Sequence, residues 1–453
     1  MADKKFMAGA ATSNITPWLG VSINGGMSNR LATHVHDELH ARCLVLDNGD
    51  MRMVMVVCDS CMIPGEVFYA AKHIAHGHTG IPMDWMLMSA THTHSAPASA
   101  SVFQTEADLE YQEFLAVRIA DAVRCAVNNL QPAQVAWGMG KEPTQVFNRR
   151  WKLKPGTMPA NPWDETTDLV KMNPPRGSDS LLEPAGPTDP EVGLLAVQTA
   201  DGKPLALLAN YSLHYVGGTG PGAISADYFG VFADRIQQLL NADRQDPPFV
   251  GILSNGTSGN INNVDFQRPG TPNPPYAQMR RVAYILADEV LRVYGTLTFQ
   301  KWVPLAMREA WLKLGVRVPN AAEVEQAKRT LSLGTGENLS ATRDIYARET
   351  VLLSQYEPEW ETSVQALRIG DLGIASTPCE TFTETGLAIK AASPLKPTFT
   401  IELANDYAGY LPTAEHHKLG GYETWRARSS FLTADSEAKV RTKILELLHE
   451  VAK

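Results

Sequence analysis

Short apolar runs that end abruptly in polar residues recur along the chain, and they constrain its fold more than any other feature. In the first of them, the run 85–88 leads into Ser-Ala-Thr-His-Thr-His-Ser-Ala and is closed by Pro97. An apolar run followed by small and β-branched residues and a turn residue predicts a buried strand. The polar residues that follow such runs are His92 and His94, His214, Ser254 and Asn255, Glu380, and Asn405 and Tyr407.

Helical patterns alternate with the predicted strands over roughly the first 140 residues. Between 108 and 129 the apolar residues recur every four positions and Pro132 follows, which predicts a helix that ends before that proline. Residues 66–76 are a second predicted helix, and 435–453 form an amphipathic helix. Because alternating strands and helices pack in layers, we expect an α/β fold of mixed β-sheets flanked by helices.

The segment 148–190 departs from this alternation. It contains eight prolines together with Trp151 and Trp163. A long irregular segment inside a compact chain is usually a functional loop or is disordered, and the two tryptophans favour an ordered loop that covers something. We therefore expect a single domain spanning 1–453, in which this proline- and tryptophan-rich loop forms one wall of a pocket.

The composition excludes several classes of function. The chain has 453 residues, of which 44% are hydrophobic and 20% charged, as expected for a globular protein with a substantial core. A net charge of −9 gives no support for nucleic-acid binding. No run of about 18 apolar residues is present, so we expect no membrane-spanning helix. The sequence is compatible with a monomer or a homo-oligomer.

The N-terminus and the cysteines bear on the cellular compartment. Met1 is followed almost directly by a strand-like segment, without the basic and apolar regions of a secretory signal. Five cysteines, an odd and sparse set, do not indicate a disulfide framework. Cys58 and Cys61 form a C-x-x-C pattern, but no second pair completes a zinc site, so we interpret them as core cysteines. We expect a cytoplasmic protein.

The polar residues at the strand ends indicate a metal site. In open α/β sheets, sites gather at strand ends, where loops shape them. A catalytic zinc takes about three or four nitrogen and oxygen ligands at ~2.0–2.2 Å, with one position left for water. His92, His214 and Glu380 would provide such a set. The structural alternative is that the histidines are satisfied core groups and that Glu380 lies in the first turn of a helix.

His92 and His94 form a pair within this pattern. Side chains alternate along a strand, so two residues that are two positions apart point to the same face. Two imidazoles on one face suit a metal ligand beside a proton donor. They equally suit two structural histidines that are hydrogen-bonded in the core.

Several motifs occur in the order found in the neutral or alkaline, non-lysosomal ceramidase family. Residues 89–97 resemble its T-H-T-H-S-x-P signature, and Asn148-Arg149 resembles its N-R-S segment. Residues 210–214, followed by Ser225-Ala-Asp227, resemble its second-histidine region. Pro378-Cys-Glu380 resembles P-G-E, and residues 405–410 with 421–423 resemble N-x-Y-x-x-Y and a Y-E element. The resemblance spans nearly the whole chain and implies a ceramidase-like catalytic domain.

The resemblance also implies a metal centre with one Zn²⁺ per chain. Carried over to this sequence, its zinc ligands would be His92, His214, Glu380 and Tyr407. Tyr410 is close enough in sequence to be the alternative tyrosine.

One part of the family pattern is absent. The serine of its N-x-G-D-x-S-P-N segment has no clean counterpart, because Asn262 stands there and Ser258 lies four residues earlier. This departure favours metal–water chemistry over a serine-dependent step. The family's ceramide-cleaving members also carry a C-terminal β-sandwich domain and usually a signal peptide, and neither is visible here, which points away from a membrane lipid.

We expect a zinc-dependent hydrolase that cleaves the carbon–nitrogen bond of an N-acyl amide, a sphingolipid or another small molecule. Zinc would lower the pKa of its bound water toward ~7 and polarise the carbonyl. Arg149, or the loop amides from Asn255 onward, would hold the oxyanion, and His94 would deliver a proton to the leaving amine. Tyr410 is a further catalytic candidate. Asp227 would orient a ligand histidine or cap a helix.

Three other interpretations are open at this point. The first is a zinc hydrolase of the same fold that acts on a soluble ester, a lactone or a small polar amide. The second is a non-catalytic protein that keeps a structural zinc. The third is a metal-free protein in which the histidines have only a structural role.

Overall fold

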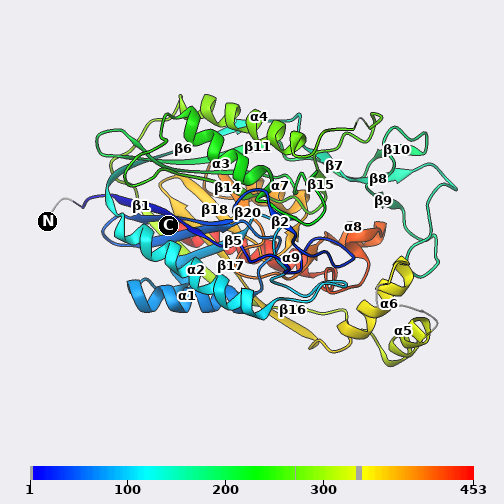
Figure 1. Cartoon of the computed structure of the whole chain (residues 1–453). Helices are drawn as coiled ribbons and strands as arrows, with labels where there is room; N and C mark the ends of the chain where they lie inside the picture. Colours follow the sequence, from blue (N-terminus) through cyan, green and yellow to red (C-terminus); the bar gives the residue numbers. More distant parts are fainter. Residues whose placement is uncertain (1–3, 271, 333–338) are drawn as a thin grey trace.

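A large mixed β-sheet forms the centre of the molecule in the computed structural model, which describes residues 4–270, 272–332 and 339–453 (Figure 1). Its inner strands are antiparallel, while the outermost pair at each edge is parallel. Across the sheet its eight strands are β14 (Val250–Asn255), β12 (Pro204–Tyr211), β11 (Glu191–Thr199), β6 (Gln131–Lys141), β1 (Met7–Asn14), β3 (His40–Asp47), β4 (Arg52–Cys58) and β5 (Met86–Ala90).

A second mixed sheet packs against one face of the first. Leu44, Leu195 and Ile252 of the first sheet share a buried core with Leu367 and Phe399 of the second. The two sheets therefore bury a common interior, as stacked sheets do. The strands of the second sheet are, in order, β16 (Leu305–Gly315), β17 (Glu359–Ile369), β18 (Leu372–Ser376) and β20 (Thr398–Ile401).

Helices cover the outer faces of both sheets, giving four layers (Figure 1). On the first sheet these helices are α1 (Gly65–Thr79), α2 (Leu109–Asn128), α3 (Asp227–Leu239) and α4 (Ala277–Tyr294); on the second they are α7 (Thr383–Ala392) and α9 (Ser436–Val451). The remaining helices are α5 (Ala321–Ser332), α6 (Thr342–Leu353) and α8 (Ala414–Leu419). The predicted class, mixed β-sheets flanked by helices, is confirmed.

The segment 148–190 is more regular than the sequence suggested. It contains β8 (Arg150–Leu153), β9 (Val170–Met172) and β10 (Leu181–Pro184), which pair into a small sheet that stands out from the body (Figure 1). The prediction of one irregular loop is therefore wrong. Strands of three or four residues, separated by long connections, leave no local periodicity in a proline-rich sequence.

Short strands join the remaining segments in pairs. β2 (His34–Val35) pairs with β13 (Ala223–Ile224), β7 (Phe147–Asn148) with β15 (Ile261–Asn262), and β19 (Glu380–Thr381) with β21 (Tyr410–Leu411). The last pair sets Glu380 directly opposite Tyr410. Among the described residues, no helix is both long and apolar enough to cross a bilayer.

Candidate metal centre

Strands from both sheets deliver the candidate residues to one place. β5 leads into His92, β12 leads into His214, and β18 leads through a short turn into Glu380. A bridge between Ser89 and Ala404 ties the end of β5 to the segment after β20. The candidate site therefore lies where the ends of the two stacked sheets meet.

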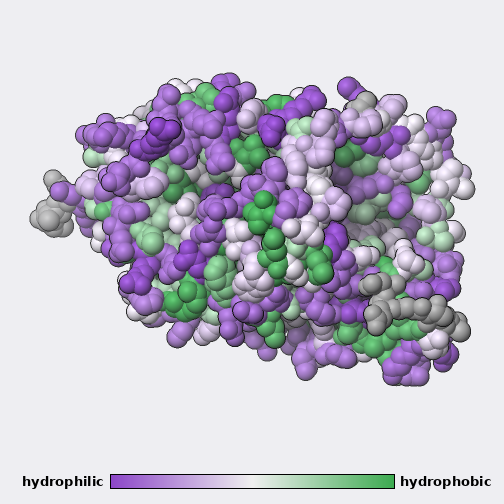
Figure 2. All heavy atoms as spheres, viewed as in Figure 1, coloured by the Kyte–Doolittle hydropathy of each residue, from purple (hydrophilic) through white to green (hydrophobic). Residues whose placement is uncertain are grey.

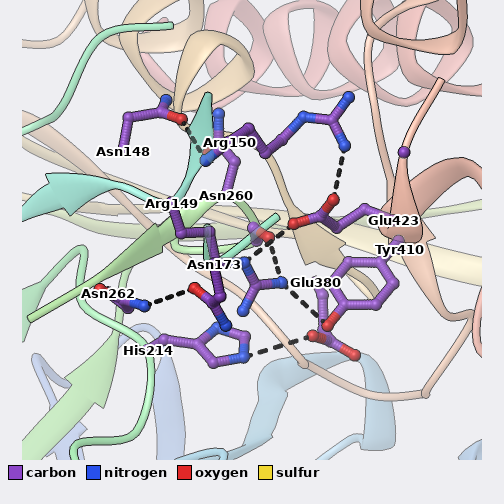
Figure 3. Close-up of polar contacts among 12 residues, drawn as sticks. Asn148, Arg149, Arg150, Asn173, His214, Asn260, Asn262, Glu380, Tyr410 and Glu423 are labelled. Carbon is purple, nitrogen blue, oxygen red and sulfur yellow. Dashed lines mark hydrogen bonds and ion pairs between the residues drawn. The ribbon is translucent and has the colours of Figure 1, made fainter. Parts of the chain in front are cut away.

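His92, His214 and Glu380 converge on one buried point (Figure 3 shows the last two). His92 Nε2 lies 3.0 Å from His214 Nε2 and 3.2 Å from Glu380 Oε2, and His214 Nε2 lies 3.8 Å from that oxygen. Ligands held ~2.0–2.1 Å from a tetrahedral zinc stand about 3.3 Å apart. The three atoms therefore have nearly the spacing of a zinc ligand set.

The hydrogen bonds of the two imidazoles turn their Nε2 atoms toward this point. His92 Nδ1 donates to the Cys61 carbonyl at 2.7 Å, and His214 Nδ1 faces the Ser258 carbonyl at 3.3 Å. A neutral ring that donates through Nδ1 carries a lone pair on Nε2. Glu380 Oε2 is buried and accepts no hydrogen bond from the described residues. Converging lone pairs of this kind need a cation, so the residues fit a divalent metal.

The charges of these groups agree with such a site. Burial opposes a charge on His92, but Glu380 raises the pKa of that histidine well above its ordinary value. Burial, together with nearby Arg149 and His92, lowers the pKa of His214 well below its ordinary value. Burial acts to raise the pKa of Glu380, but His92, Tyr410 and Arg149 together outweigh it and lower that pKa. The lowered pKa favours the ionised form of Glu380, which is the form that binds a cation.

His94 reaches the same point by a route that differs from the predicted one. β5 ends at Ala90, and His92 adopts a left-handed conformation (φ 74°), so strand alternation does not place the pair. His94 Nε2 nevertheless lies 3.1 Å from His92 Nε2, and its ring stacks on Tyr215 at 3.6 Å. A Cβ added to Gly25 would lie 2.3 Å from the His94 ring, so a glycine is needed there. Burial lowers the pKa of His94 well below its ordinary value.

Arg149 is buried beside the convergence point (Figure 3). Its Nε donates to Glu423 Oε1 at 2.9 Å, and its Nη2 donates to the Gly259 carbonyl at 2.8 Å and to Tyr410 Oη at 3.0 Å. Among the described residues, none accepts a hydrogen bond from Nη1. Arg150 binds the other oxygen of Glu423, so both arginines share one carboxylate. A fixed guanidinium with a free N–H can hold developing negative charge.

The two candidate tyrosines have different partners. Tyr407 donates its hydroxyl proton to Glu380 Oε1 at 3.0 Å, on the carboxylate oxygen that the histidines do not contact. Tyr410 instead accepts from Arg149, and its ring lies under that guanidinium. Burial and Glu380 raise the pKa of both phenols, while Arg149 acts to lower the pKa of Tyr410. Arg149 therefore favours the ionised form of Tyr410 and not that of Tyr407, although burial and Glu380 keep the pKa of Tyr410 well above its ordinary value.

Asp227 and Asn255 have surroundings that the sequence did not predict. The Asp227 carboxylate accepts from the backbone amides of Val216 and Gly217, and not from a histidine ring. It also accepts from Tyr228 N within the first turn of α3, so it holds the loop after His214 rather than that ring. Asn255 is buried, and neither of its side-chain polar atoms has a partner among the described residues. An amide left unpaired in this way can still bind a polar group.

Two buried residues lie behind the site, of which the sequence motifs pointed to Ser258 but not to Glu402. Ser258 lies under His214, and Glu402 lies behind Ser258. Glu402 directly follows β20, so the pattern that singled out His92 applies to it as well.

A pocket of about 400 Å³ opens beside β9, in a region where the surface in Figure 2 is hollowed. Tyr422 connects this pocket to the buried centre, because its ring packs edge-on against Tyr410 with 5.9 Å between the centroids. Three methionines and an indole supply much of the apolar lining; these are Met27, Met158, Met172 and Trp425. Such a pocket can hold an apolar group on the far side of Tyr422 from Tyr410.

The α/β fold of this chain has counterparts among solved structures. The neutral ceramidase from Pseudomonas aeruginosa superposes with a TM-score of 0.74 over 99% of this chain and 74% of its own, at 18% identity. A ceramidase complexed with C2 superposes with a TM-score of 0.72 over 99% of this chain and 75% of its own, also at 18% identity. The chain therefore has a neutral-ceramidase-like fold. No protein-family model and no curated protein sequence matches it.

Proposed function

We propose that the protein is a zinc-dependent hydrolase that cleaves the amide bond of an N-acyl substrate. The observation that carries this proposal is the convergence of His92, His214 and Glu380 Oε2 on one buried point. The ceramidase-like fold supports it, because those structures belong to proteins named for cleaving a lipid amide. The Arg149 guanidinium lies beside the same point and could donate a charged hydrogen bond to the oxygen of an amide carbonyl.

His92, His214 and Glu380 would hold one zinc per chain, with Tyr410 as the fourth protein ligand. Bound zinc would lower the pKa of a water toward ~7 and polarise the scissile carbonyl. Tyr407, which must keep its proton to donate to Glu380 Oε1, is then a positioning residue for that carboxylate. The family resemblance gave Tyr407 as the ligand and Tyr410 as the alternative. We choose Tyr410, because Arg149 donates to its hydroxyl oxygen and would favour its ionised form.

The remaining groups handle negative charge and protons. Arg149 Nη1 would donate to the oxygen of the tetrahedral intermediate, since its other nitrogens are already committed. His94 is neutral and therefore takes up the proton of the attacking water before passing it to the amine nitrogen. That transfer lets the carbon–nitrogen bond break with a neutral amine as leaving group. The products are a carboxylate and an amine.

The pocket beside β9 indicates which part of the substrate is apolar. Met27, Met158, Met172 and Trp425 would surround a hydrocarbon group next to the scissile carbonyl. Methionine side chains adapt their shape and fill irregular space, so they suit a flexible chain. We propose an N-acyl amide with an alkyl group as the substrate class.

A hydrolysis screen tests this function. N-acyl amides with alkyl chains of graded length, each paired with the ester of the same acid, are incubated with the protein with and without a zinc chelator. We expect amide cleavage that the chelator abolishes and that added zinc restores. Cleavage of the esters alone would contradict an amidase, and cleavage that persists in full with chelator would contradict the zinc centre.

A further inference from the structure

Glu402 is a fully buried carboxylate that takes no part in the proposed reaction. It follows β20 and lies behind the converging histidines rather than among them. Its Oε1 accepts from the Ser258 hydroxyl at 2.6 Å, and its Oε2 accepts from Thr381 N at 2.7 Å and from Ser258 N at 3.2 Å. Its own backbone N–H donates to the Asn255 carbonyl at 3.1 Å. Both oxygens are thus committed to two segments that are far apart in sequence.

One of those two segments carries a proposed zinc ligand, and the other contacts one. Thr381 follows Glu380 directly in β19, so the bond from Thr381 N fixes the backbone that aims Glu380. Ser258 lies under His214, with its hydroxyl oxygen 3.4 Å and its carbonyl oxygen 3.3 Å from His214 Nδ1. A single carboxylate therefore braces a ligand from each of the two sheets.

We propose that Glu402 is a positioning residue for the zinc centre, acting on His214 through Ser258 and on Glu380 through Thr381. His214 Nδ1–H donates to the oxygens of Ser258, and the Ser258 hydroxyl donates to Glu402. The order of donors keeps the proton on Nδ1 and leaves the Nε2 lone pair for the metal. This inference rests on the proposed function, because it assigns His214 and Glu380 as ligands.

The chemistry explains why a carboxylate is found at this position. A carboxylate behind a metal-bound imidazole fixes its tautomer and ring orientation and raises its basicity, and loss of such a group typically costs ~10–100-fold in metal affinity or activity. Here a serine hydroxyl stands between the carboxylate and the ring. An amide in place of Glu402 would still accept from Thr381 N but could not accept from both Ser258 groups and Thr381 at once.

Zinc affinity of the full-length protein tests the inference. Competition with a chelator of known affinity gives the zinc Kd of wild type, Glu402→Gln, Ser258→Ala and the double variant. We expect Glu402→Gln to weaken binding ~10–100-fold and Ser258→Ala to weaken it less, because the Ser258 carbonyl remains as an acceptor for His214. The double variant should bind about as weakly as Glu402→Gln, since both changes interrupt one chain of hydrogen bonds.

The matched control is Glu349→Gln. Glu349, which lies on α6, is also a fully buried carboxylate, but its partner is Arg428. Its substitution should lower thermal stability while leaving the zinc Kd unchanged. Thermal unfolding of each variant without zinc checks that every variant is folded before its zinc Kd is compared. If Glu402→Gln does not fold, Ser258→Ala provides a milder change.

The outcomes separate this inference from the proposed function. Zinc binding by wild type would support the zinc centre. If Glu402→Gln and Ser258→Ala then bind zinc as tightly as the control Glu349→Gln, the positioning role is wrong. Fully additive losses in the double variant would also overturn the relay through Ser258. A wild-type chain that binds no zinc would overturn both proposals.

Discussion

At the scale of single residues, the account depends on which atoms face the buried point. His92 and His214 present Nε2 because backbone carbonyls occupy their Nδ1 atoms, and Glu380 presents the oxygen that Tyr407 does not bind. Arg149 donates to the Tyr410 hydroxyl oxygen beside this point. These positions assign separate roles to neighbouring side chains, so single substitutions should have separable effects on metal binding and turnover.

The first prediction concerns Arg149→Gln. Removing the guanidinium should lower kcat/KM for an amide substrate ~10²–10³-fold, because the intermediate loses its charged donor. Zinc should still bind through His92, His214 and Glu380, although more weakly because Tyr410 loses its partner, so kcat/KM is measured on preparations saturated with zinc. Arg244→Gln removes an exposed charge on a residue that lines neither the candidate metal centre nor the pocket beside β9, and it should have little effect. Equal losses in both variants would contradict the specific role of Arg149.

The second prediction compares Tyr410→Phe with Tyr407→Phe. Loss of the Tyr410 phenol removes a proposed zinc ligand, whereas loss of the Tyr407 phenol only releases Glu380 Oε1. Tyr410→Phe should therefore weaken zinc binding more, by ~10–100-fold, as measured by chelator competition. A larger loss of zinc affinity in Tyr407→Phe would return the ligand role to Tyr407.

At the scale of elements, the strand ends were predictable and the small sheet was not. Each buried run followed by a ligand-type residue led to the site, because strands of a mixed sheet end at shared edges. The segment 148–190 could not be read in this way, because β8, β9 and β10 are short and pair over long separations. The two rings of His92 and His94 do lie together, but the predicted cause was wrong. The left-handed backbone at His92, and not strand alternation, brings them together.

The third prediction concerns the start of α3. Burial raises the pKa of Asp227 to about 6, against 3.8 for an exposed carboxyl. Because the folded state holds this proton more tightly than the unfolded state, its contribution is fully present below about pH 4 and is lost as the pH rises to about 6. A shift of this size corresponds to about 3 kcal/mol of unfolding free energy.

Urea unfolding at a series of pH values between 4 and 7 measures this effect. The unfolding free energy of wild type should fall relative to that of Asp227→Asn across this range, because the asparagine does not titrate. The variant will carry a constant loss, since the Gly217 amide then faces a side chain with one acceptor fewer. A constant difference between the two proteins over the whole range would contradict the raised pKa.

At the scale of the whole molecule, the proposed zinc site joins the two stacked sheets. His92 and His214 follow strands of the first sheet, and Glu380 follows a strand of the second. The core between the sheets is predictable from apolar patterning, but their relative placement depends on contacts between residues hundreds of positions apart. A metal held by both sheets would be lost when they separate, so binding and global stability are coupled.

The fourth prediction follows from that coupling. Zinc at about 100 times its Kd should stabilise the folded protein by about 2.7 kcal/mol, and chelation should remove this gain. Thermal unfolding with and without chelator measures the shift. His92→Ala, which lacks a proposed ligand, should unfold at the same temperature in both conditions. An equal shift in wild type and His92→Ala would place the stabilising metal elsewhere.

Titration of the metal-free protein with zinc, followed through amide hydrolysis, tests the central claim most directly. The account predicts no hydrolysis of an N-acyl amide before zinc is added, a linear rise, and a plateau at one zinc per chain. His92→Ala should stay inactive at every zinc concentration up to that point. Hydrolysis by the metal-free protein, or none at saturating zinc with any amide of the graded series, would contradict a zinc-dependent amidohydrolase.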